Sequence, residues 1–280
     1  FLNDLPASWW NLANEADAVV VIAPEFSSIL QNAISKLMPV CKLLLNCSGH
    51  FLENTCDKWL TAQRLSVKQI YHPATQLVTE VNAHWLEQHR SETGRWIIKP
   101  RDGAGCDAIQ VVDDDSLQSV LNIIRSTDSQ SRMILQPLHQ GNAFSRSAIV
   151  GAAGNSHWMP LVTQEFMVGN SMTYCGGKVL LTSDSPSLPQ LDKVLEATVE
   201  ALGRGACGWI GVDLLYSHVS NDWMVIEINP RLTTSFTGLS AAYGSGLMEQ
   251  MLRAVRGMEV CVNPTWKSIA FDAAGNVRCT

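Results

Sequence analysis

The sequence lacks the features that mark membrane proteins and nucleic-acid-binding proteins. No apolar run approaches the roughly 18 residues that a membrane span needs, and the longest candidate is Ala18 to Ala23. The formal net charge is −6, and no Lys/Arg cluster is interleaved with aromatic residues. The chain therefore lacks the positive charge that proteins use to bind the phosphate backbone of a nucleic acid. We expect a soluble protein whose partners include neither a membrane nor a nucleic acid.

Paired cysteines are lacking as well. No two of the eight have the Cys-x-x-Cys spacing of a zinc or redox site, and they lie at positions 41, 47, 56, 106, 175, 207, 261 and 279. Free thiols in a chain of 280 residues favour a reducing compartment over a secreted disulfide framework. The chain begins at Phe1 without a basic-then-apolar leader. We predict a cytoplasmic protein, and whether residues precede Phe1 stays open.

Strand and helix signals alternate in the first 70 residues. Ala18 to Ala23 is a β-branched run that predicts a buried parallel strand, and residues 42–46 predict its neighbour. Between them, apolar residues recur at helical spacing over 29–37. This order predicts a small parallel α/β domain at residues 1–70.

A further helix is expected between Asp57 and Leu65. Asn54 or Thr55 is the expected cap, because short polar side chains accept hydrogen bonds from the first free N–H groups of a helix. Asp57 would then lie in the first turn, near the positive end of the helix dipole.

Strands dominate the remainder of the chain. Two short β runs, 96–100 and 108–112, flank a glycine-containing loop, as in a hairpin. Further strands are predicted at 133–135, 145–150, 158–165, 178–182, 209–216 and 223–229, with helices from Ser116, over 189–202, near Leu239 and over 247–255. The expected fold class is α+β with a parallel α/β start.

Carboxylates interrupt two late apolar strands. Asp213 lies in the run 211–215, and Glu227 and Asn229 lie in 225–229. Glu227 and Asn229 are two residues apart, so both project to one face of a strand, where Asp213 on a neighbour can meet them. Such oxygen donors suit Mg²⁺, which takes one or two carboxylates plus substrate phosphates. The alternative is that the acids pair with arginines or end their strands in solvent.

A lysine stands beside a flexible loop. Lys99 ends the first run of the hairpin, and Gly103 and Gly105 follow it. An ammonium group beside backbone N–H groups can hold phosphate oxygens. A dinucleotide-binding fingerprint is rejected, because that motif must open a helix and residues 109–112 read as a strand. A plain hairpin turn with an exposed lysine would also explain this loop.

A short linker follows the strand at 133–135. Gln136, Pro137 and Leu138 lie where the chain leaves one subdomain for the next, and Gln140 just beyond is placed to reach a ribose. The alternative reading is an ordinary loop.

These signals resemble the ATP-grasp superfamily in their order along the chain. The order is Asp57-Lys58, then 97–100 with its glycine loop, 135–138, 211–213 and 227–231. The resemblance implies ATP bound between α+β subdomains at 71–137 and 138–280. It implies that Lys58, Lys99, Gly103 and Gly105 contact the phosphates, that Gln136, Pro137 and Leu138 contact adenine, that Gln140 contacts the ribose, and that Asp213, Glu227 and Asn229 hold Mg²⁺ or Mn²⁺.

The same resemblance assigns Arg231 to the transferring phosphoryl or acyl-phosphate group. Two residues depart from the superfamily pattern. Gln140 stands where a ribose-binding acid is usual, and Gly211 stands where many of these ligases have an arginine. Arg231 would then carry more of the phosphate binding.

A narrower resemblance lies in Val21 to Glu25 and in Glu227 to Ser235, which are similar to the tyramine–L-glutamate ligases of methanofuran biosynthesis and their bacterial relatives. In that comparison the N-terminal domain looks truncated. The resemblance implies L-glutamate and an aromatic amine as substrates, with Lys178 or Arg231 holding the second carboxylate. Loops at 169–171 and 174–177 are flexible enough to close over the site.

Other functions remain possible on the sequence. One is an ATP-grasp ligase for another amino acid or peptide. Another is a nucleotide-binding regulator without turnover, which Gln140 and Gly211 would favour and the intact acids oppose. A homo-oligomer is compatible with the sequence.

Overall fold

The computed structural model describes residues 7–106, 108–114, 116–127, 130–180, 188–244, 246–262 and 268–279. Its N-terminal part contains α1 (Ala7–Glu15), η1 (Phe26–Ser28), α2 (Ile29–Leu37), α3 (Gly49–Thr55) and α4 (Lys58–Val67). Next come β1 (Gln76–Leu77), η2 (Val78–Glu80), α5 (Ala83–Gln88), β2 (Arg95–Pro100), β3 (Gln110–Asp113), α6 (Leu117–Ser126), η3 (Gln130–Arg132) and β4 (Met133–Pro137). The rest is β5 (Asn142–Val150), β6 (Ser156–Thr163), β7 (Glu165–Val168), β8 (Met172–Val179), α7 (Leu188–Ala201), β9 (Gly208–Ser217), β10 (Asp222–Asn229), α8 (Ser235–Tyr243), α9 (Leu247–Val255), β11 (Ile269–Asp272) and β12 (Val277–Cys279).

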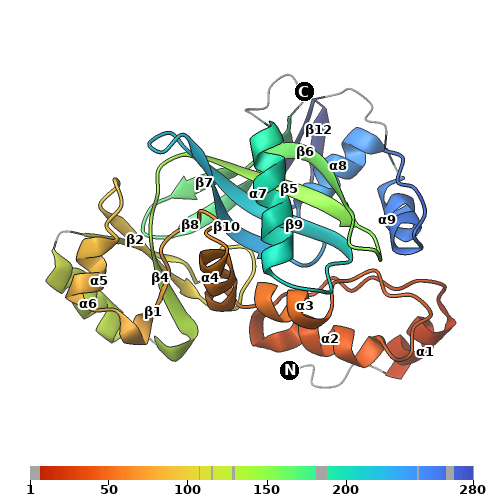
Figure 1. Ribbon diagram of the computed structural model, residues 1–280, viewed down its shortest axis with the longest axis horizontal. Helices are drawn as coiled ribbons and strands as arrows, with labels where there is room; N and C mark the ends of the chain where they lie inside the picture. Colours follow the sequence, from red (N-terminus) through yellow and green to blue (C-terminus); the bar gives the residue numbers. More distant parts are fainter. Residues whose placement is uncertain are drawn as a thin grey trace.

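Two separate antiparallel sheets organise the chain (Figure 1). The smaller sheet has the order β1-β4-β2-β3, and α5 and α6 cover it. Its core contains Trp96 and Ile98 of β2 packed with Leu86 of α5 and Val120 of α6. The larger sheet has the order β10-β9-β5-β6-β8-β11-β12, with β7 paired to β8. Helices and antiparallel strands in these proportions confirm the α+β class.

The larger sheet is covered on both faces. Along β5, Ala148 and Val150 join the core that contains α7 and the N-terminal helices, whereas Ile149 joins the core that contains α8 and α9. Neighbouring side chains in a strand point to opposite faces, so both faces of this end of β5 carry buried apolar residues. Figure 1 shows α7 crossing one face of the sheet, with α1 to α3 beside it.

The N-terminal region forms less strand than predicted. The predicted strands 18–23 and 42–46 meet only in a parallel bridge between Val19 and Leu44. Further along, the Asn46 side chain replaces the backbone ladder: its Oδ1 accepts from the Val21 N–H at 2.7 Å and its Nδ2 donates to the Val21 carbonyl at 2.9 Å. The two segments are therefore parallel neighbours, as predicted, but the backbone hydrogen bonds between them are fewer than a full strand pair would form.

Asp57 caps a helix rather than lying within its first turn. Two helices, α3 and α4, stand where one was predicted, and Asp57 is the N-cap of α4. Its carboxylate accepts from the N–H groups of Trp59 and Leu60 at 2.9 and 3.3 Å. The predicted caps Asn54 and Thr55 instead form the end of α3, and the charged acceptor that caps α4 is Asp57.

Several other predicted strands shift. The predicted strand 158–165 is divided at Gln164 into β6 and β7, and β8 begins at Met172, well before the predicted residue 178. Residues 181 and 182 of that prediction lie outside the described ranges. The hairpin formed by β7 and β8 had no strong alternation in sequence, and neither did β11 and β12.

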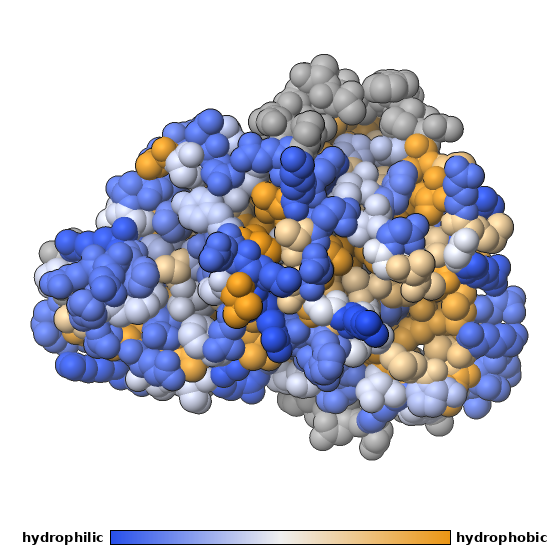
Figure 2. Space-filling model, in the orientation of Figure 1, coloured by the Kyte–Doolittle hydropathy of each residue, from blue (hydrophilic) through white to orange (hydrophobic). Residues whose placement is uncertain are grey.

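The surface is uneven in polarity. Figure 2 shows hydrophilic residues over most of the lobe that carries α5 and α6, while hydrophobic residues gather on the half that carries α9 and the N-terminal helices.

All eight cysteines are free thiols. Within the described ranges, no helix is long and apolar enough to cross a membrane.

Candidate active site

A cavity of about 770 Å³ lies between the two sheets. Its lining comes from β2 and β4 of the small sheet, from β5, β9 and β10 of the large sheet, from the β7–β8 hairpin and from the start of α8. Most of the predicted site residues meet here, namely Lys99, Gly105, Gln136, Pro137, Leu138, Asp213, Glu227, Asn229 and Arg231. Segments more than 100 residues apart in sequence are thereby brought to one place.

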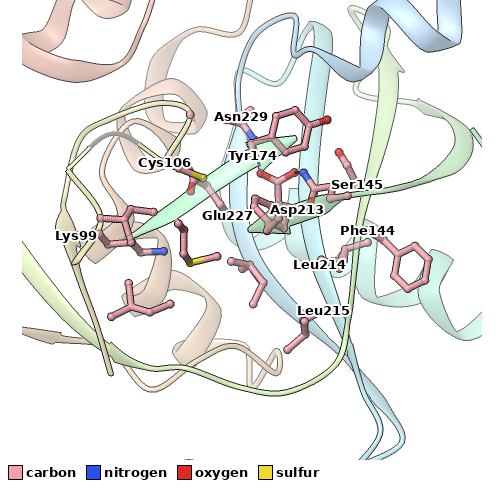
Figure 3. A pocket seen from close by; sticks show the side chains of 18 of the residues that line it. Lys99, Cys106, Phe144, Ser145, Tyr174, Asp213, Leu214, Leu215, Glu227 and Asn229 are labelled. Atoms are coloured by element: carbon pink, nitrogen blue, oxygen red, sulfur yellow. Dashed lines mark hydrogen bonds between the residues drawn. The ribbon is translucent and has the colours of Figure 1, made fainter. Parts of the chain in front are cut away.

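One side of the cavity, called the carboxylate wall, consists of Asp213, Glu227 and Asn229. The pairing of β9 with β10 puts Asp213 directly opposite Glu227, and Asn229 lies two residues further on the same strand. A β-bulge between Val225 and Glu227 aligns this register, since a bulge re-aims the residues that follow it. Figure 3 shows the three side chains gathered on one side of the cavity, with Lys99 on the other.

The Asp213 carboxylate is held in an unfavourable electrostatic position. Asn229 Nδ2 donates to its Oδ2 at 3.0 Å and Gln164 Nε2 donates to its Oδ1 at 2.9 Å. Burial, followed by the negative charge of Glu227, raises the pKa of Asp213 to about 6, against the lowering effect of these hydrogen bonds. A buried carboxylate whose charge is disfavoured in this way is a group that a cation would stabilise.

The donor set of the carboxylate wall fits a hard divalent ion. Among the residues that the structure describes, no group of three or more His, Cys, Asp or Glu side chains could hold a metal. Two carboxylates and an amide are too few for an all-protein cage, but they suit Mg²⁺ or Mn²⁺ that also binds phosphates. Asp213, Glu227 and Asn229 would hold such an ion.

The opposite side, called the lysine wall, consists of Lys99 and the glycine loop, residues 101–106, together with Lys58, which contacts the loop but does not line the cavity. Lys99 is buried on β2, and burial lowers its pKa to about 8, partly opposed by the negative charge of Glu227. Lys58, the first residue of α4, lies with its Nζ 3.1 Å from Glu227 Oε1 and 2.8 Å from the Gly103 carbonyl. Lys58 thus bridges the glycine loop to the carboxylate wall.

The glycine loop has an unusual backbone. Gly105 and Cys106 have φ values of 71° and 69°, a left-handed conformation that non-glycine residues rarely adopt. Gly105 lines the cavity directly, whereas Gly103 contributes through its carbonyl bond to Lys58. Asp102 of the loop accepts hydrogen bonds from the Ser27 N–H and from Arg132.

An apolar slot continues from the linker between the sheets. The buried Gln136 donates from Nε2 to Thr75 Oγ1 at 2.8 Å, and the Leu138 N–H donates to the Arg95 carbonyl at 2.8 Å. Apolar side chains complete this part of the cavity, namely Ile97, Phe144, Leu214, Leu215 and Ile226. A flat aromatic ring system fits between such walls.

Four predicted residues lie outside the lining, namely Lys58, Gly103, Gln140 and Lys178. Gln140 is exposed, and its backbone N–H donates to Glu92 Oε1 at 2.6 Å. Lys178 is exposed on β8, and its backbone N–H donates to the hydroxyl of Thr163, which does line the cavity. Asn142, two residues beyond Gln140, lines the cavity instead. No sequence signal distinguished Asn142 from its polar neighbours.

Arg231 is fixed by a residue from the far end of the chain. Its Nε and Nη2 lie 2.7 and 3.1 Å from the two carboxylate oxygens of Glu25. The motifs that contain Glu25 and Arg231, both recognised in sequence, are thus joined in space. Beside Arg231, the cavity is lined by Thr233, Thr234 and Ser235.

Gly211 lies against Thr233. A Cβ atom added at Gly211 would be 3.0 Å from Thr233 Cγ2, which is tighter than ordinary van der Waals contact. Thr233 therefore occupies the space that a larger residue at position 211 would need.

The β7–β8 hairpin lines the cavity and contains both segments that were predicted as closing loops, 169–171 and 174–177. The first forms the hairpin tip, whereas the second lies within strand β8 and is not a loop. Phe166, Met172 and Tyr174 line the cavity from it. Its tip reaches the small sheet, where the Val111 N–H donates to the Asn170 carbonyl at 3.0 Å and Arg95 Nη2 donates to the Gly169 carbonyl at 2.9 Å. The predicted loop 169–171 thus lies across the space between the sheets.

Comparisons with known proteins identify two family models that match the chain. A family model described as an ATP-grasp domain matches residues 55–235, and one described as a pre ATP-grasp 3 domain matches residues 2–50. No curated protein sequence matches the chain.

Solved structures share the fold. An ATP-grasp superfamily protein from Archaeoglobus fulgidus is 25% identical, with a TM-score of 0.67, and the match covers 95% of this chain and 72% of that one. N5-carboxyaminoimidazole ribonucleotide synthetase from Thermus thermophilus is 16% identical with a TM-score of 0.71, covering 93% and 67%. L-amino acid ligase from Bacillus licheniformis is 17% identical with a TM-score of 0.62, covering 84% and 57%. This chain therefore spans between 57% and 72% of the length of these three chains.

Proposed function

The chain belongs to the ATP-grasp family, and from that premise we propose that it is a Mg-ATP-dependent ligase. The proposed reaction phosphorylates a carboxylate to an acyl phosphate and transfers the acyl group to an amine, releasing ADP and phosphate. The observation that carries this proposal is the cavity in which Asp213, Glu227 and Asn229 face Lys99 across an apolar slot.

Each part of the cavity has a role in this proposal. The apolar slot with Gln136 to Leu138 would bind adenine, and Asn142 rather than Gln140 is the better placed residue for the ribose. Lys99 and the backbone of the glycine loop would hold the phosphates. Magnesium held by the carboxylate wall would neutralise charge on the transferring phosphoryl group.

The β7–β8 hairpin supports the second half of the reaction. An acyl phosphate reacts with an amine in preference to water only where water is excluded and the amine is held in line. The hydrogen bonds from Val111 and Arg95 to the hairpin tip support such a role, because they hold it across the cavity.

L-Glutamate with tyramine or a similar amine is the substrate pair that we propose. The support comes from the two sequence motifs that resemble tyramine–L-glutamate ligases. These motifs contact each other through the hydrogen bonds between Glu25 and Arg231. Arg231 is the better placed residue for a substrate anion, since Lys178 lies outside the cavity lining. A cytoplasmic location belongs to this proposal and is supported by the eight free thiols.

A second candidate is ligation of another amino acid in the same cavity. The shared fold with an L-amino acid ligase supports it. Incubation of the protein with ATP, Mg²⁺, a panel of acids and a panel of amines separates the candidates, with ADP release and the mass of the product as readouts. A glutamyl amide supports the first candidate. Turnover with another acid alone refutes the glutamate assignment, and the absence of turnover with every pair argues for a nucleotide-binding regulator.

A further inference from the structure

Glu25 is a buried carboxylate that belongs to the N-terminal domain. Only 4% of its surface is exposed, and its partner Arg231 is 206 residues away along the chain. Both oxygens of Glu25 are used, one by Nε and one by Nη2 of the guanidinium. A bidentate pair of this kind fixes the plane of the guanidinium as well as its position.

The remaining donors of Arg231 are those that a ligand can use. A guanidinium has five N–H donors. Two are committed to Glu25, and a third, on Nη1, donates to the Leu232 carbonyl at 3.2 Å. The other two N–H groups have no partner among the described residues, and Arg231 lines the cavity. One of them lies on Nη1 and one on Nη2, so each terminal nitrogen keeps an N–H group for a ligand.

The loop that carries Glu25 also contacts the lysine wall. Ser27 and Ser28 have φ values of 52° and 57°, so two consecutive non-glycine residues adopt the left-handed conformation, which persists only where the surrounding structure enforces it. The Ser27 N–H donates to Asp102 Oδ2 of the glycine loop at 2.8 Å. One N-terminal loop therefore contacts both Arg231 and the glycine loop.

We propose that Glu25 is a positioning residue that orients Arg231 for hydrogen bonding to the phosphoryl group in transfer, so that the N-terminal domain completes the active site. The inference rests on the proposed function. An ion pair that only joins two domains would hold the protein together without affecting how Arg231 meets a ligand.

Four variants test the inference: Glu25→Gln, Arg231→Gln, the double variant and Asp192→Asn. Asp192 pairs with the buried Arg146, away from the cavity lining, and serves as the matched control for loss of an ion pair. The double variant leaves no unpaired charge at the contact and so guards against misfolding. Calorimetry measures the Kd of Mg-ADP alone and of Mg-ADP with aluminium fluoride, which mimics the phosphoryl group in transfer.

The wild type should prefer the aluminium fluoride complex by roughly 100-fold or more, as transition-state mimics are preferred. Glu25→Gln should reduce that preference about tenfold and leave Mg-ADP binding within about twofold, because one oriented charged hydrogen bond is lost. Arg231→Gln should do the same, and the double variant should be no weaker than Arg231→Gln, because Glu25 acts through Arg231. Asp192→Asn should match the wild type.

Distinct outcomes overturn the two proposals. A Glu25→Gln variant that keeps the wild-type preference refutes the positioning role and leaves the ligase proposal intact. A double variant weaker than Arg231→Gln alone also refutes it, even if Glu25→Gln does not fold. A wild-type protein that binds no Mg-ADP refutes the proposed function, and the inference fails with it.

Discussion

The two walls of the cavity are built in different ways. The carboxylate wall is carried by adjacent strands, with Asp213 opposite Glu227 in the ladder and hydrogen bonds fixing the carboxylate of Asp213. The lysine wall has one strand residue, Lys99, and otherwise relies on the first residue of a helix and on a loop with left-handed residues. This difference suits the proposed roles, because metal ligands need fixed geometry, whereas residues that bind phosphates can adjust as the nucleotide enters.

The largest effect is expected on the carboxylate wall. Asp213→Asn or Glu227→Gln should reduce turnover by roughly 100-fold or more, because in the proposed reaction each would remove a charge that holds the metal ion at the transferring phosphoryl group. Steady-state kinetics at saturating Mg²⁺ measure the loss. Glu200→Gln, which breaks an exposed ion pair with Lys68, is the control and should retain full turnover. Activity of Asp213→Asn within a few-fold of wild type would place the metal elsewhere.

The lysine wall should affect binding more than folding. A nucleotide at 100 times its Kd stabilises the native state by roughly 2.7 kcal/mol. Lys99→Ala should remove part of that gain, because it removes the buried ammonium group that we propose contacts the phosphates. Thermal unfolding with and without Mg-ATP measures the difference. The exposed Lys193→Ala is the matched control. An equal melting shift in wild type and Lys99→Ala would contradict the assignment.

A pH experiment tests the electrostatics of the carboxylate wall. The pKa of Asp213 is raised from 3.8 to about 6 in the folded protein, so the native state binds this proton more tightly than the unfolded state does. Its contribution to stability is present below pH 4 and is lost as the pH rises through 6. Between pH 5 and 7.5 the loss should be about 1 kcal/mol without metal. Urea unfolding of wild type and Asp213→Asn at both pH values measures it, and an equal change in both proteins would refute the shift.

The smallest effect is expected at the linker. Gln140→Ala should change the KM for ATP by no more than about twofold, because the described contact of Gln140 uses its backbone N–H and not its side chain. Asn142→Ala, which removes a residue of the cavity lining, should raise the KM more. A larger effect at Gln140 than at Asn142 would restore the sequence-based ribose assignment.

The sequence revealed the parts of the site that depend on local pattern. Asp213, Glu227 and Asn229 were recognisable because acids inside apolar strands need a partner, and antiparallel pairing then brought them together. The Asn46 side chain, which substitutes for a strand ladder, leaves no periodic signal. The contact between Glu25 and Arg231 depends on tertiary packing over 206 residues, which no local pattern encodes. The proposed boundary between subdomains at 137 and 138 stays a prediction.

The close approach of Gly211 to Thr233 has a consequence for variation among relatives of this chain. A side chain at position 211 would meet Thr233 at 3.0 Å from its first carbon, so the Thr233 side chain would have to shift by a few tenths of an ångström to admit it. Relatives with arginine at the position of Gly211 should carry a smaller residue, such as glycine, alanine or serine, at the position of Thr233. Substitutions at these two positions should therefore be correlated across the family, and the pair would distinguish one subfamily from another.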